Sequence, residues 1–396
     1  MIILVIIGYI LINLYLLFSS WRWMRLWLKS RFHKVGKICL VILYVLIVLP
    51  GPAAYFMKPG SVQAAMQRFN NCWLGVLIYY CIFSVIIDLI LLILKYFKRA
   101  PRTPKVLRNW SIGIGAVFFG LVLSVSIYGM HHANQIHLNR HEINVNKKVP
   151  GMEKMKVVLI ADLHMGYSIG LGNIRDMVAK VNSCNPDLII IAGDIFDNSY
   201  DAIEHPDEIL QELKKLDSTF GTYAVYGNHD INEKLFCGFS VHGRDTALRD
   251  EREDEFLKKA GITVLEDSSI CVDDRFYLVG RLDAQKSGDG LNKRKTVKQL
   301  LKDLDKEKAI FVIDHEPLEI DETAQAGADI QFCGHTHAGQ FFPLNIACSI
   351  LWENAWGILK KDDMYNIVTS GIGVYGPDMR VGTDSEIMEI IVNFSK

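Results

Sequence analysis

Residues 155–164 read Met-Lys-Val-Val-Leu-Ile-Ala-Asp-Leu-His, an apolar run that ends in Asp162-Leu-His164. The branched side chains predict a buried β-strand over about Lys156–Ala161, because such side chains fit the pleated surface of a sheet. In extended backbone, residues two apart point to the same side, so Asp162 and His164 present an oxygen and a nitrogen together. The stretch therefore predicts a strand with a pair of polar ligands at its carboxyl end.

Four later strand-like runs are followed by polar residues of the same kinds. In chain order these residues are Gly193-Asp194, Gly227-Asn228-His229-Asp230, His315 and Gly334-His335-Thr-His337. Carboxylate, imidazole and amide oxygen together suit a borderline divalent metal such as Mn, Fe or Zn. A lone histidine is usually structural, but five such elements in order, each behind a strand, predict a metal centre.

The part of the chain after Met155 alternates short apolar runs with amphipathic stretches. Helices are predicted over about Asn173–Asn182, Asp207–Leu216, Arg252–Ala260 and Arg294–Leu304. Strands are predicted at Lys156–Ala161, Asp187–Ala192, Thr222–Tyr226, Ile262–Leu265, Phe276–Val279, Ala309–Ile313, Asp329–Phe332, Asn366–Thr369 and Ile387–Val392. This alternation predicts an α/β layered fold with its site at the carboxyl ends of strands.

The net charge of −1 over 396 residues hides two unlike halves. Residues 1–150 hold 17 Lys and Arg against only Asp88 and Glu142, whereas residues 151–396 hold 26 Lys and Arg against 42 Asp and Glu. A nucleic-acid binder is not expected, because the basic half is also the apolar half and the other half is acidic. We expect a membrane domain with its linker over residues 1–150 and a second domain over 151–396.

Four apolar runs lie in the basic half, and each is close to the ~20 residues that a helix needs to cross a bilayer. They cover about Met1–Phe18, Ile38–Phe56, Trp73–Leu94 and Trp110–Met130. The first run lacks a basic leading segment and a small-residue cleavage site, so it is predicted to be a retained span. Pro50 and Pro52 are expected to end or kink the second span. The sequence thus predicts an all-α bundle of four transmembrane helices.

Basic residues concentrate in the loops Trp21–Lys37 and Lys95–Arg108. By the positive-inside rule these loops are cytoplasmic, which places the domain after the fourth span outside. We therefore expect a multi-pass integral protein of the cell membrane with an extracytoplasmic C-terminal domain. The scattered cysteines argue mildly against an oxidising environment outside the membrane. If only three of the four runs were inserted, the C-terminal domain would lie on the cytoplasmic side.

Asp88 lies inside the third predicted span. An intramembrane carboxylate is expected to have a partner or a function. A polar contact with a residue such as Asn13 is one reading, and a role in transport or signalling is the other.

The motifs resemble those of the calcineurin-like metallophosphoesterases over about Lys156–Asn393. The resemblance implies a four-layer αββα sandwich with two divalent metal ions, Mn first and Fe or Zn as alternatives. It implies that Asp162, His164 and His337 hold one metal and that Asn228, His315 and His335 hold the other. Asp194 would bridge both metals. The continuation Ala338-Gly339-Gln340 and the tail Ser370-Gly371-Ile372-Gly373 are similar to a membrane-associated bacterial branch that includes UDP-2,3-diacylglucosamine pyrophosphatase-like enzymes. That branch more often has Gly where Ala338 stands.

The implied chemistry is attack of a metal-bound hydroxide on a phosphorus atom held between two metals. His229 is assigned to stabilising the developing charge or to protonating the leaving oxygen. Asp230 is expected either to orient His229 or to cap a helix. Arg380 is expected to bind a substrate phosphate oxygen or to pair with Glu386.

The leading hypothesis is a membrane-anchored hydrolase of a phosphodiester or pyrophosphate bond. Its partners would be the lipid bilayer and a phosphate-ester substrate, either lipid-linked or soluble. The alternative class is a non-catalytic membrane sensor or transporter subunit on a phosphoesterase scaffold. Asp88 is the feature in its favour, and the intact set of ligands argues against it. The sequence leaves the oligomeric state open.

Overall fold

The computed structural model describes residues 2–98, 103–233, 235–236, 239–240, 249–286 and 294–395. The chain divides into two compact units. The first consists mainly of Met1–His131, and the second contains His132–Leu235 and most of the chain that follows.

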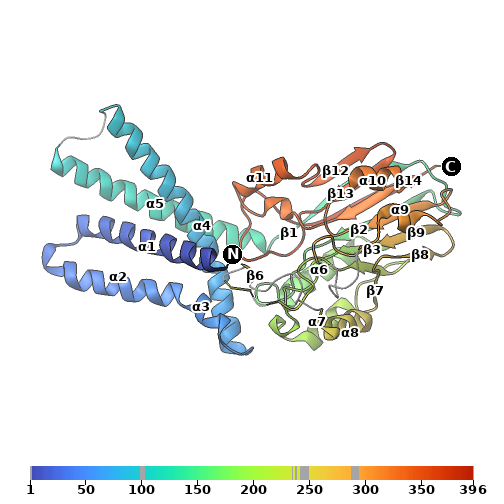
Figure 1. Ribbon diagram of the computed structural model, residues 1–396, viewed down its shortest axis with the longest axis horizontal. Helices are drawn as coiled ribbons and strands as arrows, with labels where there is room; N and C mark the ends of the chain where they lie inside the picture. Colours follow the sequence, from blue (N-terminus) through green and yellow to red (C-terminus); the bar gives the residue numbers. More distant parts are fainter. Residues whose placement is uncertain are drawn as a thin grey trace. The chain divides into compact units, whose positions relative to one another are not determined.

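The first unit is helical (Figure 1). It contains α1 (Ile2–Trp27), η1 (Ser30–Phe32), α2 (His33–Val48), α3 (Pro50–Tyr55), α4 (Ser61–Tyr96) and α5, which covers Pro104–Ala133 and runs on into the second unit. Four stretches are long and apolar enough to cross a membrane, namely Ile6–Trp27, Ser30–Tyr55, Ser61–Tyr96 and Pro104–Ala133. The predicted break at Pro50 is confirmed, because α2 ends at Val48 and α3 begins at Pro50.

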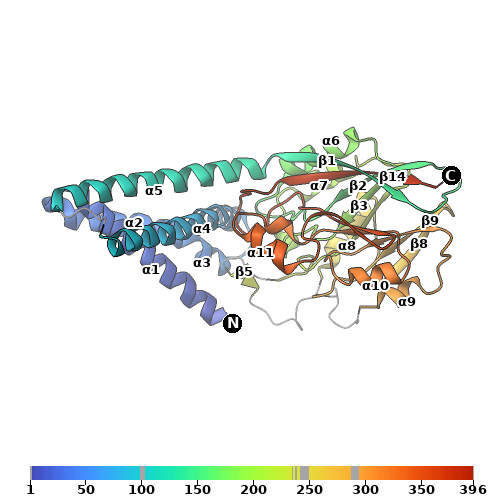
Figure 2. The same cartoon turned by 90° about the horizontal axis from the view of Figure 1, so that it is seen from above.

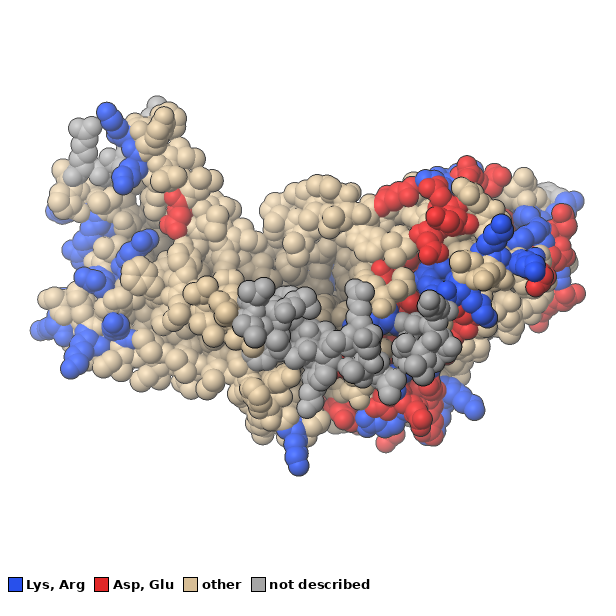
Figure 3. Space-filling model, viewed as in Figure 1, with Lys and Arg blue, Asp and Glu red and all other residues tan. Residues whose placement is uncertain are grey.

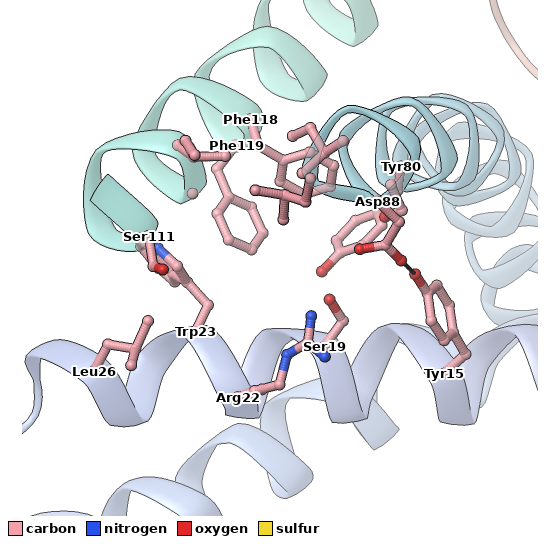
Figure 4. Close-up of a pocket in the computed structure, with 15 residues that line it drawn as sticks. Tyr15, Ser19, Arg22, Trp23, Leu26, Tyr80, Asp88, Ser111, Phe118 and Phe119 are labelled. Atoms are coloured by element: carbon pink, nitrogen blue, oxygen red, sulfur yellow. Dashed lines mark hydrogen bonds between the residues drawn. The ribbon is translucent and has the colours of Figure 1, made fainter. Parts of the chain in front are cut away.

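Helices α1, α4 and α5 share an apolar core that includes Leu16, Tyr80 and Phe118. Beside it lies a cavity of about 140 Å³ whose polar lining includes Arg22 and Asp88 (Figure 4).

Asp88 makes a polar contact within the bundle, as one of its two readings predicted, but the partner is Tyr15 and not Asn13. The Tyr15 hydroxyl donates to Asp88 Oδ2 at 2.7 Å (Figure 4). Asn13 instead accepts a hydrogen bond from Tyr44 of α2 at 3.1 Å. Residues two apart on a helix lie ~200° apart around its axis. Asn13 and Tyr15 therefore face different neighbours.

The second unit contains two six-stranded sheets. The first sheet has the order β1 (Ile136–Val145), β14 (Ser385–Phe394), β2 (Lys154–Ile160), β3 (Leu188–Ala192), β4 (Thr222–Val225) and β7 (Ile262–Val264). The second has the order β12 (Gly357–Lys361), β13 (Met364–Val368), β11 (Ile330–Cys333), β10 (Ala309–Ile313), β9 (Phe276–Gly280) and β8 (Ser268–Val272). Most neighbouring strands are parallel, with antiparallel pairs at β14–β2, β8–β9 and β12–β13.

Side-chain alternation along β2 explains the layering. Val157 and Leu159 enter the core between the two sheets, whereas Val158 and Ile160 face the helices outside the first sheet. Those helices are α6 (Leu171–Ser183), α7 (Pro206–Leu213) and α8 (Glu251–Ala260) (Figure 1). On the second sheet, α9 (Val297–Leu301) and α10 (Ile320–Gln325) cover the outer face. The predicted αββα sandwich is confirmed.

Strand β1 was not predicted from the sequence. It pairs in parallel with β14, with Ile136 opposite Ser385 (Figure 2). Its polar and half-exposed residues reflect its place at the edge of the sheet, which weakens the apolar pattern of a buried strand. Strands β8 and β12 and helix α11 (Leu344–Leu351) were likewise not predicted.

Candidate metal centre

The polar residues singled out in the sequence follow the ends of β2, β3, β4, β10 and β11. They lie at the carboxyl ends of strands from both sheets, so the loops of the two sheets meet at one place. Most of these residues are buried, with Asp162, His164 and His315 at 0% exposure.

Several of the predicted ligands have left-handed backbone, which is uncommon for residues other than glycine. The φ angles are 52° at Asp162, 46° at His164, 50° at Asp194, 71° at His335 and 48° at His337. Such backbone costs free energy and is kept where the surroundings enforce it, typically at functional sites. The turns therefore hold these side chains in fixed directions.

The side chains form two adjacent groups. Asp162, His164 and His337 make the first, and Asp194, His315 and His335 make the second; within each group the candidate ligand atoms lie within 4.8 Å of one another. Asn228 joins the second group, because its Oδ1 lies 2.9 Å from His335 Nδ1 and 3.1 Å from His315 Nε2.

Asp194 lies between the two groups. Its Oδ2 is 3.1 Å from His315 Nε2 and 3.7 Å from His164 Nε2. One carboxylate therefore faces nitrogen atoms of both sets.

The donor set fits divalent cations. His315 Nδ1 lies 2.8 Å from the carbonyl oxygen of Ala192, so Nδ1 donates there and Nε2 is the ring atom that faces the other candidate ligands. Burial opposes protonation of this ring, but Asp194 raises the pKa of His315 well above its usual value, so a cation would have to displace the Nε2 proton. His315 Nε2 faces oxygen atoms of Asn228 and Asp194, which offer electron pairs. Electron-pair donors that converge in a buried place need a cation, and mixed nitrogen and oxygen ligands suit Mn, Fe or Zn.

Burial governs the protonation of these groups. It raises the pKa of Asp162 to about 7 and lowers the pKa of His164 to about 4 and that of His335 to about 3. Burial also opposes ionisation of Asp194, but His315 and His229 hold its pKa well below the usual value. Bound cations would supply the positive charge that the buried carboxylates lack.

His229 adjoins both groups. Its main-chain N–H donates to Asp194 Oδ1 at 2.8 Å, and its Nδ1 lies 2.9 Å from Asn198 Oδ1. Because the amide oxygen can only accept, Nδ1 carries the proton and Nε2 is left for a substrate. The ring packs 4.1 Å from that of Tyr375, centroid to centroid. Burial lowers the pKa of His229 to about 3.

Comparison with known proteins identifies this part of the chain. Residues 155–339 match the calcineurin-like phosphoesterase family. The C-terminal domain belongs to this family. It is a phosphoesterase domain, and the protein is a hydrolase of phosphoric esters.

Relatives of similar organisation extend the match into the helical half. A transmembrane protein with metallophosphoesterase domain from Danio rerio is 26% identical and covers 89% of this chain and 79% of its own. The Bos taurus protein of the same name is 29% identical over 63% of this chain and 56% of its own. An uncharacterized metallophosphoesterase of Campylobacter jejuni is 25% identical over 78% of this chain and 77% of its own. With the four apolar helices, these relatives indicate an integral membrane protein.

Asn198 and Tyr375 of the phosphoesterase domain were not predicted as site residues. Asn198 lies four residues after Asp194, in the loop after the same strand. This closeness to a predicted ligand is the sequence feature that could have identified it as a site residue. Tyr375 lies in the tail after Gly373, and nothing in the local sequence connects it to His229.

Asp230 lies away from the predicted contact with the His229 ring. Its Oδ1 accepts from the Phe196 main-chain N–H, and its Oδ2 accepts from that of Gly227, both at 2.7 Å. Asp230 therefore ties the loop after β3 to the loop after β4, and Asn198 makes the contact with the His229 ring. The residues around Asp230 form a turn and begin no helix within the described range 229–233.

Arg380 also lies elsewhere than predicted. It is 0% exposed, and its Nη2 donates to the carbonyl oxygens of Ser370 at 2.6 Å and Gly373 at 2.8 Å. The same atom lies 3.3 Å from His337 Nδ1. Glu386, the alternative predicted partner, accepts from the Ser370 main-chain N–H at 2.7 Å. Arg380 is therefore buried and supports the loop behind His337.

Two glycines allow the loops of the phosphoesterase domain to approach. A Cβ atom on Gly193 would lie 2.5 Å from His315 Nδ1, and the φ angle there is +84°. A Cβ atom on Gly371 would lie 2.6 Å from Asp162 Cβ, with φ at +78°. These glycines pack against the ligands, so the tail that contains Gly371 serves as a close-packed turn.

Proposed function

We propose that the protein is a membrane-anchored phosphoesterase with a dinuclear metal centre that hydrolyses a phosphodiester or pyrophosphate bond. The observation that carries the proposal is the position of Asp194, whose Oδ2 lies 3.1 Å from His315 Nε2 and 3.7 Å from His164 Nε2. A carboxylate placed between two sets of ligands is suited to bridge two cations.

The ligands divide as follows in this proposal. Asp162, His164 and His337 would hold the first cation, and Asn228, His315 and His335 would hold the second, with Asp194 placed to serve both. Nitrogen and oxygen ligands without a thiolate suit manganese first, with iron or zinc as alternatives. When bound, such cations would polarise a phosphoryl group and lower the pKa of a coordinated water molecule.

The protein's own residues position and polarise the substrate. Asn198 accepts from His229 Nδ1, which leaves Nε2 for a phosphoryl or leaving-group oxygen. Burial keeps free His229 neutral, since its pKa is lowered to about 3. An anionic phosphate beside the ring raises that pKa, because an opposite charge favours the protonated form. His229 then stabilises the developing negative charge or protonates the leaving oxygen.

Asp230 and Arg380 bind main-chain atoms of the loops that carry the proposed ligands. Asp230 joins the loops that hold Asp194 and Asn228 through its two main-chain contacts. Arg380 holds the carbonyls of the loop beside His337. Both are positioning residues in this proposal, and neither touches the substrate.

The basic loops support a topology with four spans in the cell membrane and an extracytoplasmic phosphoesterase domain. Under this topology residues 1–150 are the membrane domain with a linker, and β1 of that linker joins the sheet of the catalytic domain over residues 151–396. A phosphate ester of the membrane or cell envelope is the substrate class that this placement favours. The acidic composition of the second half disfavours nucleic acid as a substrate.

The test is hydrolysis of bis-p-nitrophenyl phosphate by the purified full chain with added Mn²⁺. The wild type is expected to release p-nitrophenol, and Asp194→Asn and His229→Ala are expected to lose most of the activity. Ser218→Ala, on the loop before β4, is the matched control and is expected to keep it. Equal rates in all four proteins would refute the proposed centre and favour a non-catalytic membrane protein.

A further inference from the structure

Helix α11 of the phosphoesterase domain and the residues beside it present an exposed apolar surface, with Glu353, which pairs with Lys361, as an exposed charge beside it. We define the α11 patch as the exposed side chains of Phe342, Leu344, Ile346, Ile350, Leu351 and Trp356. Ile350 is 78% exposed and Leu351 is 80% exposed, and α11 itself contains no charged residue. In Figure 3 the surface at the position of α11 shows no Lys, Arg, Asp or Glu, whereas such residues crowd the surface farther along this domain. Contiguous exposed apolar surface usually marks a binding face.

The patch is fixed to the metal centre. Helix α11 begins seven residues after His337, and its buried Cys348 has Sγ 3.8 Å from the carbonyl oxygen of Thr336. At the far end of the helix, the Trp352 ring lies 5.3 Å from the ring of His335. Thr336 Oγ1 also donates to the carbonyl oxygen of Ala355 at 2.6 Å. The segment that carries the patch therefore packs on the residues beside two candidate ligands.

The two polar side chains of α11, Asn345 and Ser349, each make a hydrogen bond within the helix, and Asn345 Oδ1 accepts from the Ile346 main-chain N–H at 3.0 Å. The Ser349 hydroxyl donates to the Ile346 carbonyl oxygen of the same helix at 2.8 Å. An exposed helix with its hydroxyl satisfied internally can lie against hydrocarbon without leaving that donor unpaired. A water-facing helix would gain from charged residues, and α11 has none.

Because the chain has helices long and apolar enough to cross a membrane, a lipid bilayer is the candidate to cover the α11 patch. The apolar helix α5 ends at Ala133, and β1 begins at Ile136. Two residues reach at most ~7 Å when extended, so a short connection joins the phosphoesterase domain to a helix that is long and apolar enough to cross a membrane. A lipid surface is thus always within reach of this domain.

We propose that the α11 patch inserts into the bilayer surface and that the metal centre acts on amphiphilic phosphoesters whose chains remain in the membrane. The inference rests on the proposed function for the chemistry, whereas the insertion of the α11 patch stands without it. Apolar side chains on a short helix immerse at the level of the headgroups, where Trp is also favoured. The scissile phosphate of a lipid lies at that same level, beside the segment that carries the ligands.

The insertion is tested on the wild-type full chain in nanodiscs of phosphatidylcholine that carries a diazirine on an acyl chain. After illumination, mass spectrometry maps the lipid adducts. Adducts are expected on the four apolar helices and on the peptide with Leu344–Leu351, and not on β8, where Ile270 is also an exposed apolar residue at 37%. Adducts confined to the four helices would overturn the insertion.

The substrate class is tested with two diesters that share a leaving group, bis-p-nitrophenyl phosphate and hexadecyl p-nitrophenyl phosphate in nanodiscs. The double variant Ile350→Asp and Leu351→Asp is expected to lose about tenfold or more of kcat/KM on the hexadecyl ester and to keep the rate on the soluble ester. The control variant Ile270→Asp is expected to keep both rates.

The other outcomes are also decisive. Equal loss on both esters would overturn a lipid-specific role for α11. A dimer in nanodiscs that the double variant abolishes would make a second copy the occupant and would overturn insertion. If the wild type hydrolyses neither ester while α11 still carries lipid adducts, the proposed function fails and the insertion of the patch stands.

Discussion

The Nδ1 atom of His229 lies 2.9 Å from the Oδ1 atom of Asn198, and this contact joins the loop after β4 to the loop after β3. Asn198 is 1% exposed and has a left-handed φ of 60°, so its amide is held in place. The amide oxygen selects the tautomer of His229 that leaves Nε2 unprotonated. The proposed chemistry uses this orientation of the ring, because Nε2 faces the substrate and becomes a donor once an anionic phosphate has raised the pKa of His229.

Replacing Asn198 by Ala is expected to lower kcat about tenfold to a hundredfold, the usual effect of losing a partner that orients a site residue. Because the substrate would still bind the metals, KM should change little. Steady-state kinetics on bis-p-nitrophenyl phosphate provide the measurement. Asn198→Asp keeps the acceptor and adds a negative charge, so it should retain more activity and shift the pH–rate profile upward, since a nearby carboxylate raises the pKa of His229. Equal rates in Asn198→Ala and the wild type would contradict this role.

Replacing Gly193 by Ala is expected to weaken metal binding. The new Cβ would lie 2.5 Å from His315 Nδ1 in a backbone with φ of +84°, so the ring must move. The affinity for Mn²⁺, measured by isothermal titration calorimetry, should fall about tenfold or more. Gly170→Ala is the matched control, because a Cβ atom there meets nothing within 4 Å and φ is −118°. Unchanged affinity in Gly193→Ala would show that His315 holds no metal.

Replacing Arg380 by Met is expected to weaken the metal centre without weakening substrate binding. The change leaves buried carbonyls such as those of Ser370 and Gly373 without their donor, at about 1–3 kcal/mol for each unpaired group. The dissociation constant of Mn²⁺ should rise, while KM at saturating metal should stay the same. Arg175→Met on α6 removes a half-exposed guanidinium and serves as the control. A raised KM with unchanged metal affinity would instead assign Arg380 to the substrate.

Glu253 on α8, which is not among the proposed metal ligands, gives a prediction about how the stability of the domain depends on pH. It is 0% exposed, and burial raises its pKa to about 9. The folded domain thus keeps Glu253 protonated, while the unfolded chain ionises it above its ordinary pKa of about 4.3. Below pH ~4 the domain has all of the stability associated with this proton. That stability declines as the pH rises toward 9, and the loss is about 4 kcal/mol near pH 7.

Glu253→Gln should therefore stabilise the phosphoesterase domain more at pH 8 than at pH 5. Hydrogen exchange of the β3 amides in both proteins at each pH measures the difference. Glu255→Gln, an exposed neighbour on the same helix, should show no such gain. An equal or larger gain at pH 5 would contradict the raised pKa.

The sequence predicts the layered fold because β-branched runs such as Asp187–Ala192 are buried on both faces and amphipathic stretches separate them. It also predicts which polar residues gather, because the loops after parallel strands meet at one edge. Asp162 and His337 are 175 positions apart in the chain, yet each follows a strand of the sandwich and both reach the same group.

The sequence does not predict contacts that depend on the path of a loop. Asn198 reaches His229 through a left-handed turn, and Arg380 turns into the interior instead of outward. Helix α11 has an apolar run without the alternation of charged residues that identifies a surface helix, so its exposure emerges only in the folded structure. Each of these features follows from tertiary placement and not from local periodicity.

The most direct test of the dinuclear centre is the rate of bis-p-nitrophenyl phosphate hydrolysis as Mn²⁺ is added to the metal-free full chain. With Asp194 shared between two groups of ligands, we expect little activity at the first equivalent and full activity as the second binds. Full activity at one equivalent, or in the metal-free protein, would contradict the proposed centre.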